Sequence, residues 1–333
     1  MNNKIAVIGA GSFGTSLAML LVGKGHDVSI WGRKKSQMAL MRDTLENPHY
    51  LPGIKLPKEL NIVDEMVDAL KDAHIVLFSV PAQQFRSVFA DAMKYLVGNE
   101  IIVNVAKGIE KESLLRLSQV AKELMPDVKY VTLSGPSHAE EVAKSLPTTV
   151  AVASDDVELA LKVQDIFNTD RFRVYTNDDI AGVELGGSLK NIIALGAGIS
   201  DGMGFGDNAK AAMMTRGITE MSRLGIVMGA KPETFAGLTG LGDLIVTCTS
   251  MHSRNRRCGI LIGEGNTVAN AMEKIGMVVE GISTAEAAGA LADKYDIEMP
   301  ITQCICMMIE GKINANEAVD ILMGRKTKNE MYI

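Results

Sequence analysis

The chain has 333 residues, of which 47% are hydrophobic and 22% are charged, and its formal net charge is −6. This composition is typical of a globular protein with sizeable cores, and the length suffices for two domains. The acidic balance gives no reason to expect nucleic acid or an anionic membrane as a partner. No apolar run reaches the ~20 residues of a membrane span, and the N-terminus lacks a charged-then-apolar signal, so we expect a cytoplasmic protein.

The cysteine pattern does not indicate a metal site. Cys248, Cys258, Cys304 and Cys306 lack the paired spacing of zinc ligands, and the last two are only two positions apart, which places them on different faces of a helix. We therefore expect reduced thiols and no bound metal.

The stretch from Lys4 to Lys35 predicts a strand, a glycine turn, a helix and a second strand. Lys4 to Ile8 is a short apolar run of the length of a buried parallel strand, Thr15 to Lys24 has helical periodicity, and Val28 to Trp31 is again strand-like. Between the first strand and the helix lies Gly9-Ala10-Gly11-Ser12-Phe13-Gly14. A GxGxxG motif in this position is the signature of a dinucleotide-binding unit.

Each glycine of the motif has a physical role. Gly9 permits the tight turn, Gly11 lets the backbone approach a pyrophosphate, and Gly14 lets the helix pack close to the strand. The N-terminus of the helix then offers unpaired N–H groups to the anion. An ordinary glycine-rich turn is the less specific alternative.

The residues after the second strand bear on the choice of cofactor. NAD-selective sites usually place an acidic residue there, whereas a basic residue suits a ribose 2′-phosphate. Arg33 and Lys34 occupy the position, which favours NADP, although a solvated basic turn would look the same. Tyr50, in the loop from Asn47 to Gly53, is a candidate to stack on the adenine or to anchor that loop.

Further strands and helices alternate up to about residue 180, which predicts a doubly wound sheet. The expected strands are Ile62 to Val63, Ile75 to Val80, Ile101 to Val105, Tyr130 to Leu133, Thr148 to Ala153 and Arg173 to Tyr175. Lys107 follows a central strand, at the edge where ligands bind in open α/β sheets, or else it is a solvent-facing turn lysine. Ser137 and Glu140 have the spacing of a capping box and predict a helix start beside Gly135.

From about Gly182 the pattern is helical, and no strong strand signal follows. We therefore predict an N-terminal Rossmann-type domain over residues 1–185 and an all-α domain over residues 186–333. The 20 methionines are interpreted as core residues.

Three segments of the second domain carry polar residues that a plain helix bundle would not need. Lys190 lies within an apolar helix, so it must be paired, exposed in a cleft or shifted in pKa, and it is a candidate proton donor or acceptor. Asp243, between glycines and an apolar run, is a natural partner for it. Ser253, Arg254 and Asn255 could bind a phosphate, or Arg254 to Arg257 could be a solvated basic patch.

Several blocks in this order resemble the bacterial type of the NAD(P)-dependent glycerol-3-phosphate dehydrogenase family along essentially the whole chain. The blocks that carry the resemblance are Gly9 to Gly14, Leu133 to Ala139, Leu189 to Ala194, Gly202 to Asn208, Gly237 to Leu244 and Ser253 to Asn255.

The resemblance implies reversible NADP(H)-dependent reduction of dihydroxyacetone phosphate to sn-glycerol 3-phosphate, with NAD(H) as a second possible cofactor, in a homodimer that supplies phospholipid synthesis. It implies Lys190 as the proton donor or acceptor. The implied substrate contacts are Lys107, Gly135, Ser137, Lys190, Asp243, Ser253, Arg254 and Asn255. The implied cofactor contacts are Gly9, Gly11, Ser12, Phe13, Gly14, Arg33, Lys34, Tyr50, Lys107, Ala139, Arg254, Val278 and Glu280.

Two other functions remain open at this level. One is a related two-domain dehydrogenase that acts on a 3-hydroxy acid. The other is a non-catalytic NADPH-binding sensor, which would have no need for Lys190, Asp243 and Arg254 together.

Overall fold

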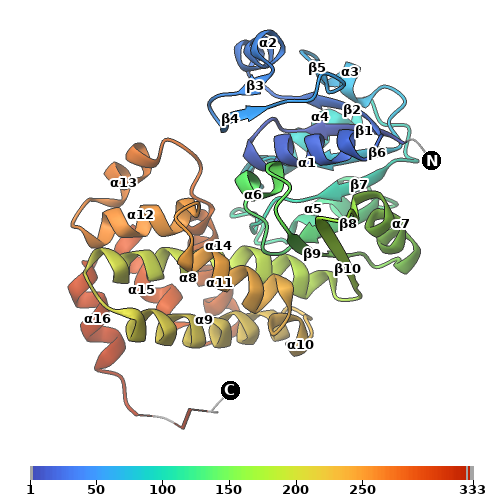
Figure 1. Ribbon diagram of the computed structural model, residues 1–333. Coiled ribbons are helices and arrows are strands. Elements are labelled where there is room, and N and C mark those ends of the chain that lie inside the picture. The colour runs from blue at the N-terminus through green and yellow to red at the C-terminus, as the bar shows by residue number, and fades with distance from the viewer. Residues whose placement is uncertain (1–2, 328, 331–333) are drawn as a thin grey trace. The chain divides into compact units, whose positions relative to one another are not determined.

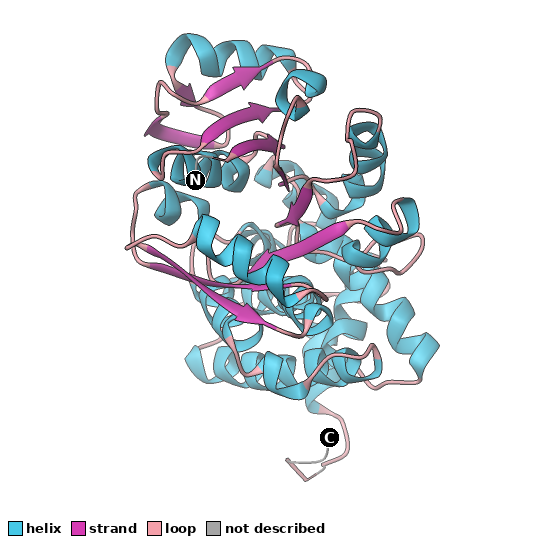
Figure 2. Cartoon of the chain, turned by 90° about the vertical axis from the view of Figure 1, so that its right-hand side faces the viewer, coloured by secondary structure: helices cyan, strands magenta, loops and turns pink. Residues whose placement is uncertain are grey.

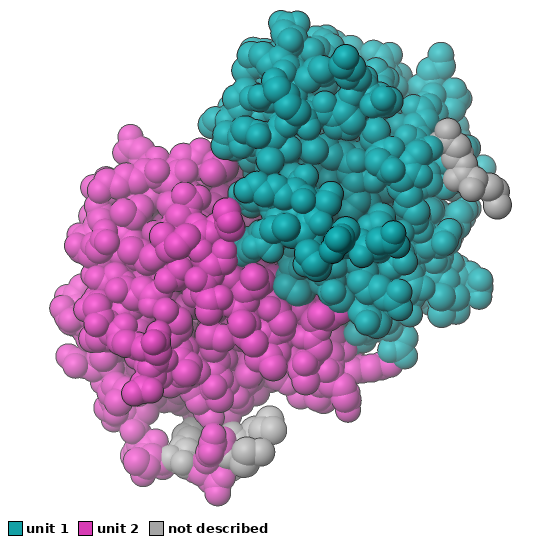
Figure 3. Space-filling view, in the orientation of Figure 1, with its two compact units in different colours: residues 1–106, 117–183 teal, residues 107–116, 184–333 magenta. Residues whose placement is uncertain are grey.

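The computed structural model describes residues 3–327 and 329–330, and the chain forms two compact units (Figure 3). Unit 1 comprises Met1–Ala106 and Leu117–Val183, and unit 2 comprises Lys107–Arg116 and Glu184–Ile333. In the described part of the chain, no helix combines the length and apolar character that crossing a membrane requires.

Unit 1 is built on an eight-stranded sheet (Figures 1 and 2). In spatial order the strands are β10 (Phe172–Asn177), β9 (Thr148–Ala153), β8 (Lys129–Ser134), β7 (Ile101–Asn104), β6 (Ile75–Phe78), β1 (Lys4–Ile8), β2 (Asp27–Trp31) and β5 (Asn61–Val63). All neighbours run parallel except β8 and β9. The predicted Rossmann-type sheet is confirmed, and the strand order reverses between β1 and β6, where such sheets bind ligands.

Two helical layers cover this sheet, because its strands are apolar on both faces. Helix α1 packs against α6 and α7, and α4 packs against α3 and α5. The elements are α1 (Ser12–Gly23), α2 (Lys35–Thr44), α3 (Met66–Leu70), the 3-10 turn η1 (Ala82–Gln84), α4 (Phe85–Met93), α5 (Leu117–Leu124), α6 (Ala139–Ala143) and α7 (Val157–Phe167). Phe78, Phe85 and Phe89 form a fully buried aromatic group under one of these layers.

Two local predictions in unit 1 were wrong. The loop expected from Asn47 to Gly53 contains an antiparallel ribbon of β3 (Glu46–Asn47) and β4 (Leu51–Lys55). The predicted capping box does not form, because α6 begins after His138 and the hydroxyl of Ser137 donates instead to the carbonyl oxygen of Gly135, at 2.9 Å. A serine hydroxyl can bond within a turn as readily as it can cap a helix, and the spacing cannot distinguish the two.

Unit 2 is rich in helices, as predicted (Figure 1). After α8 (Ile180–Gly202), whose first residues belong to unit 1, come α9 (Asp207–Val227), α10 (Pro232–Phe235), the π-helical turn η2 (Leu238–Gly242), α11 (Asp243–Thr249), α12 (Arg254–Gly263), α13 (Val268–Ile275), α14 (Glu280–Tyr295), α15 (Pro300–Ile309) and α16 (Ala315–Met323).

Glycines bring α8 and α12 into backbone contact. A Cβ on Gly198 would lie 2.1 Å from the carbonyl oxygen of Arg256, and one on Gly259 would lie 2.1 Å from that of Leu195. Gly202 and Gly263 continue the contact one turn further along, with distances of 2.2 Å to backbone oxygens. Since real side chains cannot approach so closely, only glycine allows α12 to lie this near to α8.

We expect Gly259→Ala to lower the free energy of unfolding by about 1–3 kcal/mol, because the added methyl group must push two backbones apart. Thermal unfolding followed by circular dichroism measures the effect. Gly23→Ala is the control, since its Cβ would meet no atom within 4 Å and alanine is the better helix residue. Equal unfolding temperatures for the two variants would contradict the tight contact.

Candidate active site

The glycine turn after β1 has the geometry that a dinucleotide requires. Gly9 has a φ of +117°, and a Cβ there would lie 2.3 Å from the carbonyl oxygen of Ser79. A Cβ on Gly14 would lie 2.1 Å from the oxygen of Gly9, whereas one on Gly11 would meet no atom within 4 Å. The open side of the turn is therefore at Gly11, where α1 begins without a side-chain cap and presents free N–H groups to an anion. These residues fit the pyrophosphate of NAD(P).

Polar side chains fix the backbone of this glycine turn by hydrogen bonds. The amide of Asn47 is fully buried and donates to the carbonyl oxygen of Ala10, at 3.0 Å, and to the hydroxyl of Thr15, at 2.9 Å. Gln37 donates to the same carbonyl oxygen of Ala10, at 2.7 Å. The sequence did not predict the roles of Asn47 and Gln37, because the type and position of a polar residue do not show which backbone group its side chain will contact.

The loop with Tyr50 also reaches the glycine turn. The hydroxyl of Ser12 donates to the carbonyl oxygen of Tyr50, at 2.6 Å, and the ring of Tyr50 is half-buried with an edge contact to His49. This hydrogen bond fastens the loop with Tyr50 to the glycine turn.

The basic turn after β2 lies next to the glycine turn. Gly32 is buried, and a Cβ on it would lie 2.9 Å from the Cβ of Ala10, so the following residues begin close to the start of the motif. Arg33 and Lys34 are both exposed, and neither forms an ion pair with a described residue, whereas Lys35 pairs with Glu65. Two positive charges without an ion pair among the described residues therefore follow β2, at the end of the strand where dinucleotide-binding units usually carry the residue that selects the cofactor.

In unit 2, one buried carboxylate binds two lysines. Lys190 Nζ donates to Asp243 Oδ1 at 2.6 Å, and Lys107 Nζ donates to Asp243 Oδ2 at 2.7 Å. Lys190 also donates to the hydroxyl of Thr247 at 2.6 Å, and that hydroxyl donates to the main-chain oxygen of Asp243 at 2.6 Å. The pair predicted from the sequence is therefore present, and it is almost fully buried: Lys190 is 5% exposed and Asp243 is 1% exposed.

The local fold explains why these groups meet. Lys190 lies in the middle of α8, and a Cβ on Gly186, one turn earlier, would lie 2.7 Å from the carbonyl oxygen of Thr239. Helix α8 therefore approaches the turn η2, which leads directly into Asp243 at the start of α11. Thr247 is one turn further along α11, on the face that carries Asp243.

Burial and charge act against each other in this cluster. Desolvation lowers the pKa of the Lys190 ammonium to about 8, although Asp243 partly restores it. Burial alone would raise the pKa of the Asp243 carboxyl, but the ammonium groups of Lys107 and Lys190 outweigh it and hold that pKa below its ordinary value. Near neutral pH, Lys190 is thus a charged group that can give up its proton readily. Such a group can stabilise an oxyanion and then protonate it.

An amide network fixes the N-terminal end of α12. Asn255 donates from Nδ2 to Oδ1 of Asn191 at 2.9 Å and accepts from the N–H of Gly281 at 2.9 Å. Because Asn191 follows Lys190 directly on α8, the network ties the start of α12 and of α14 to the lysine-bearing turn. The hydroxyl of Ser253 caps α12 by accepting from the N–H of Arg256, and Arg254 is the first residue of the helix. Sequence reasoning named Asn255 but missed Asn191 and Thr247, which resemble ordinary helix residues.

The remaining predicted residues belong to different parts of the chain. Gly135, Ser137 and Ala139 follow β8 in unit 1, where Gly135 has a φ of +138°. Val278, which is 43% exposed, and Glu280 stand at the start of α14 in unit 2. Phe13 is in the first turn of α1.

Comparisons with known proteins agree along the whole chain. The family description "NAD-dependent glycerol-3-phosphate dehydrogenase N-terminus" matches residues 4–160, and the corresponding C-terminus matches residues 179–320. The chain is 53% identical to glycerol-3-phosphate dehydrogenase [NAD(P)+] of Pelotomaculum thermopropionicum, over 99% of this chain and 96% of that one. It is 52% identical to the protein of the same name in Bacillus cereus, over 98% and 97%. The crystal structure of glycerol-3-phosphate dehydrogenase from Coxiella burnetii superposes with a TM-score of 0.94 at 39% identity, over 97% of this chain and 99% of that one.

Proposed function

Since the chain belongs to the NAD-dependent glycerol-3-phosphate dehydrogenase family, we propose that it reduces dihydroxyacetone phosphate reversibly to sn-glycerol 3-phosphate, with Lys190 as the acid–base residue. The observation that carries the proposal is the buried ammonium of Lys190, held at 2.6 Å by Asp243. NADP(H) is the proposed cofactor, with NAD(H) as a second one. An assay of NADPH oxidation with dihydroxyacetone phosphate tests the activity.

The cofactor would supply the hydride. The residues of the chain bind the cofactor and stabilise the negative charge that develops on the substrate oxygen. The glycine turn and the N–H groups of α1 hold the pyrophosphate, with Gly9, Gly11, Ser12, Phe13 and Gly14 as contacts. Arg33 and Lys34 would bind the phosphate of the adenine ribose, and Tyr50 would stack on the adenine. The other proposed cofactor contacts are Lys107, Ala139, Arg254, Val278 and Glu280.

Lys190 acts where the ketone oxygen gains negative charge. Reduction of a carbonyl leaves an alkoxide on oxygen, and an ammonium that is already desolvated requires little reorganisation to stabilise it. The proton then passes from Nζ to the oxygen, and in the reverse direction the neutral amine accepts the proton of the alcohol. Asp243 keeps the lysine in place, and Lys107 adds a second positive charge to the same carboxylate.

The start of α12 is the proposed phosphate-binding element. The guanidinium of Arg254 can form two parallel hydrogen bonds to a phosphate, and Asn255 is fixed by Asn191 and Gly281. Binding of the remote phosphate would orient the carbonyl for reaction. The remaining proposed substrate contacts are Gly135, Ser137 and Ser253.

The two other functions are less well supported. A sensor would have no use for a buried acid–base lysine, whose burial costs free energy. A 3-hydroxy acid dehydrogenase is distinguished by a panel of phosphorylated and carboxylated substrates. We propose further that the enzyme is a cytoplasmic homodimer that supplies phospholipid synthesis, with residues 1–185 as the dinucleotide-binding domain and residues 186–333 as the catalytic domain.

Lys190→Met should reduce kcat for dihydroxyacetone phosphate by at least ~10²-fold, the scale of a positioned acid–base group. The dissociation constant of NADPH should stay nearly unchanged. The variant should fold, since Asp243 keeps Lys107 as its partner. Lys312→Met, which removes an exposed lysine paired with Glu310, is the control and should keep its kcat. Normal turnover in folded Lys190→Met would exclude this lysine and leave Lys107 as the candidate.

The pH dependence should follow the pKa of Lys190, which burial lowers to about 8. Ketone reduction needs the ammonium, so kcat/KM should be level below pH 8 and fall above it, while the oxidation of glycerol 3-phosphate should rise through the same range. Lys107→Met removes a neighbouring cation and should move both limbs to higher pH, and Asp243→Asn should move them to lower pH. Limbs that stay at one pH in all three proteins would contradict the assignment.

Arg33→Ala should weaken NADPH more than NADH, because only NADPH carries the 2′-phosphate that the guanidinium can bind. The loss should be about 1–3 kcal/mol, as for a charge-assisted hydrogen bond. Fluorescence titration of both cofactors measures it. Equal losses for NADPH and NADH would show that this turn does not read the 2′-phosphate.

A further inference from the structure

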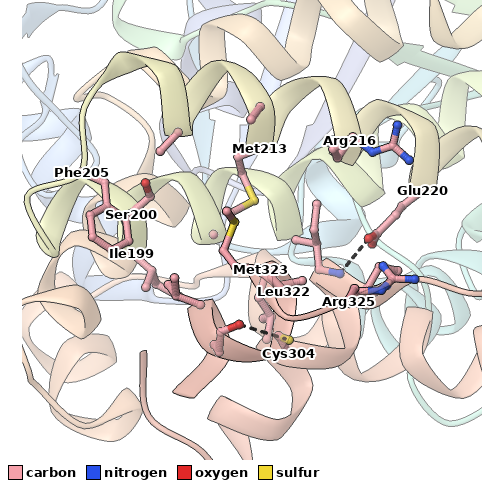
Figure 4. A pocket seen from close by; sticks show the side chains of 18 of the residues that line it. Ile199, Ser200, Phe205, Met213, Arg216, Glu220, Cys304, Leu322, Met323 and Arg325 are labelled. Atoms are coloured by element: carbon pink, nitrogen blue, oxygen red, sulfur yellow. Dashed lines mark hydrogen bonds between the residues drawn. The ribbon is translucent and has the colours of Figure 1, made fainter. Parts of the chain in front are cut away.

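A cavity of about 480 Å³ lies within unit 2, between α8, α9, α15 and α16 (Figure 4). Its size is in the range of small-molecule sites, roughly 300–1,000 Å³. None of the residues that line it belongs to the proposed substrate or cofactor contacts. Along α9 the lining runs from Ala209 to Arg223, so at ~1.5 Å per residue the cavity is long rather than round.

The body of the cavity is apolar. Its wall consists of aliphatic and sulfur-containing side chains, and two flexible methionines, the partly buried Met213 on α9 and the exposed Met323 on α16, can adapt to a chain-like ligand (Figure 4). The apolar residues that line this part include Ile199, Met213, Ile301, Cys304, Ile305, Met308, Leu322 and Met323.

Charged residues gather at one end, where Figure 4 shows Arg216, Glu220 and Arg325 near one another. The Glu220 carboxylate is already committed, because it accepts from the N–H of Ile301 at 2.7 Å and from the N–H of Thr302 at 3.1 Å. Arg325 is also committed, since it pairs with Glu298 at 3.1 Å.

Two cations that line the cavity, Arg216 and Lys326, the residue after Arg325 in the chain, form no ion pair with a described residue. Arg216 is exposed and donates only to the carbonyl oxygen of Glu330, at 3.3 Å, and it forms no ion pair with a described residue. Lys326, also exposed and also lining the cavity, forms no ion pair with a described residue either. With Arg223, Glu298 and Glu330 included, the lining holds four cations and three acidic residues, so an anion would find a net excess of one positive charge.

A second polar residue, Ser200, lies towards the other end. Ser200 lines the cavity and is only 5% exposed, yet its hydroxyl has no hydrogen-bond partner among the described residues. It lies near Phe205 in Figure 4, on the side away from Arg216. Since buried hydroxyls are normally paired, an unpaired one in a cavity wall indicates a ligand group that can hydrogen-bond there.

We propose that this cavity binds a single-chain aliphatic anion, with its carboxylate or phosphate head at Arg216 and Lys326 and its chain along the apolar wall towards Ser200. The ligand class follows from the elongated apolar shape, the spare positive charge at one end and the unpaired hydroxyl at the other. The site is separate from the Lys190 cluster, and α8 carries parts of both.

Isothermal titration of the full chain with sodium decanoate, below its micelle concentration, tests the proposal. We expect one site per chain, and each added methylene from octanoate to decanoate should tighten binding roughly fourfold. Decanol, which has the chain without the charge, should bind at least ~10-fold more weakly. Decyl phosphate is measured beside decanoate to identify the preferred head group. 10-Hydroxydecanoate should bind more tightly than decanoate, and Ser200→Ala should remove that preference.

Variants at the cavity localise the effect. Arg216→Glu and Lys326→Glu should each weaken decanoate at least ~10-fold, and Ala212→Trp, at an exposed lining position, should block it. Lys274→Glu, an exposed residue of α13 outside the cavity, should leave binding unchanged. Circular dichroism verifies the folding of each variant.

Absence of decanoate binding overturns the proposal. So does a loss of binding that is equal for Lys274→Glu and Arg216→Glu. If decanoate fails to bind and Ala212→Trp changes the sedimentation coefficient, the cavity is instead a contact between copies of the chain.

Discussion

The buried carboxylate of Asp243 is the constraint on which unit 2 depends. A single negative charge that is 1% exposed would be very unfavourable, and two lysine ammonium groups compensate it from opposite oxygens. The arrangement also leaves a net positive charge in an almost water-free place. Apolar residues of similar volume would often give an equal or larger free energy of unfolding. The cluster therefore indicates selection for chemistry rather than for stability.

Close backbone contacts give that cluster its precision. Gly186 brings α8 to the turn before Asp243, and Gly198 and Gly259 bring α12 to α8. Each contact replaces a side chain with direct backbone packing, which leaves little room for the helices to slide. In unit 1, Gly9 and Gly14 have the same role between β1, β6 and α1. The geometry of the glycine turn and of the Lys190–Asp243 cluster therefore depends on glycine positions where no side chain fits.

The sequence predicts the features that follow from local pattern. The strand–glycine–helix unit could be identified because Gly9, Gly11 and Gly14 have a spacing that few other structures require. The partnership of Lys190 with Asp243 was predictable because a lysine on an apolar helix needs a counter-charge. Asn47 and Thr247 were not predictable, since their contacts depend on which backbone or side chain the fold brings opposite them. The failed capping box at Ser137 has the same cause, because one hydroxyl had two local acceptors available.

The segment Lys107–Arg116 lies between two parts of unit 1 in the sequence but belongs to unit 2. The Arg116–Glu184 and Lys111–Glu286 ion pairs connect it to the rest of unit 2, and a bridge between Ile109 and Arg116 closes the segment on itself. The chain therefore passes from one unit to the other at three points, and no single cut separates them. A recombination event at the last junction, after Val183, would exchange Lys107 together with the sheet-bearing part and leave Asp243 in place. Asp243 would then keep a lysine on both of its oxygens only if the incoming segment supplied a lysine at the same position.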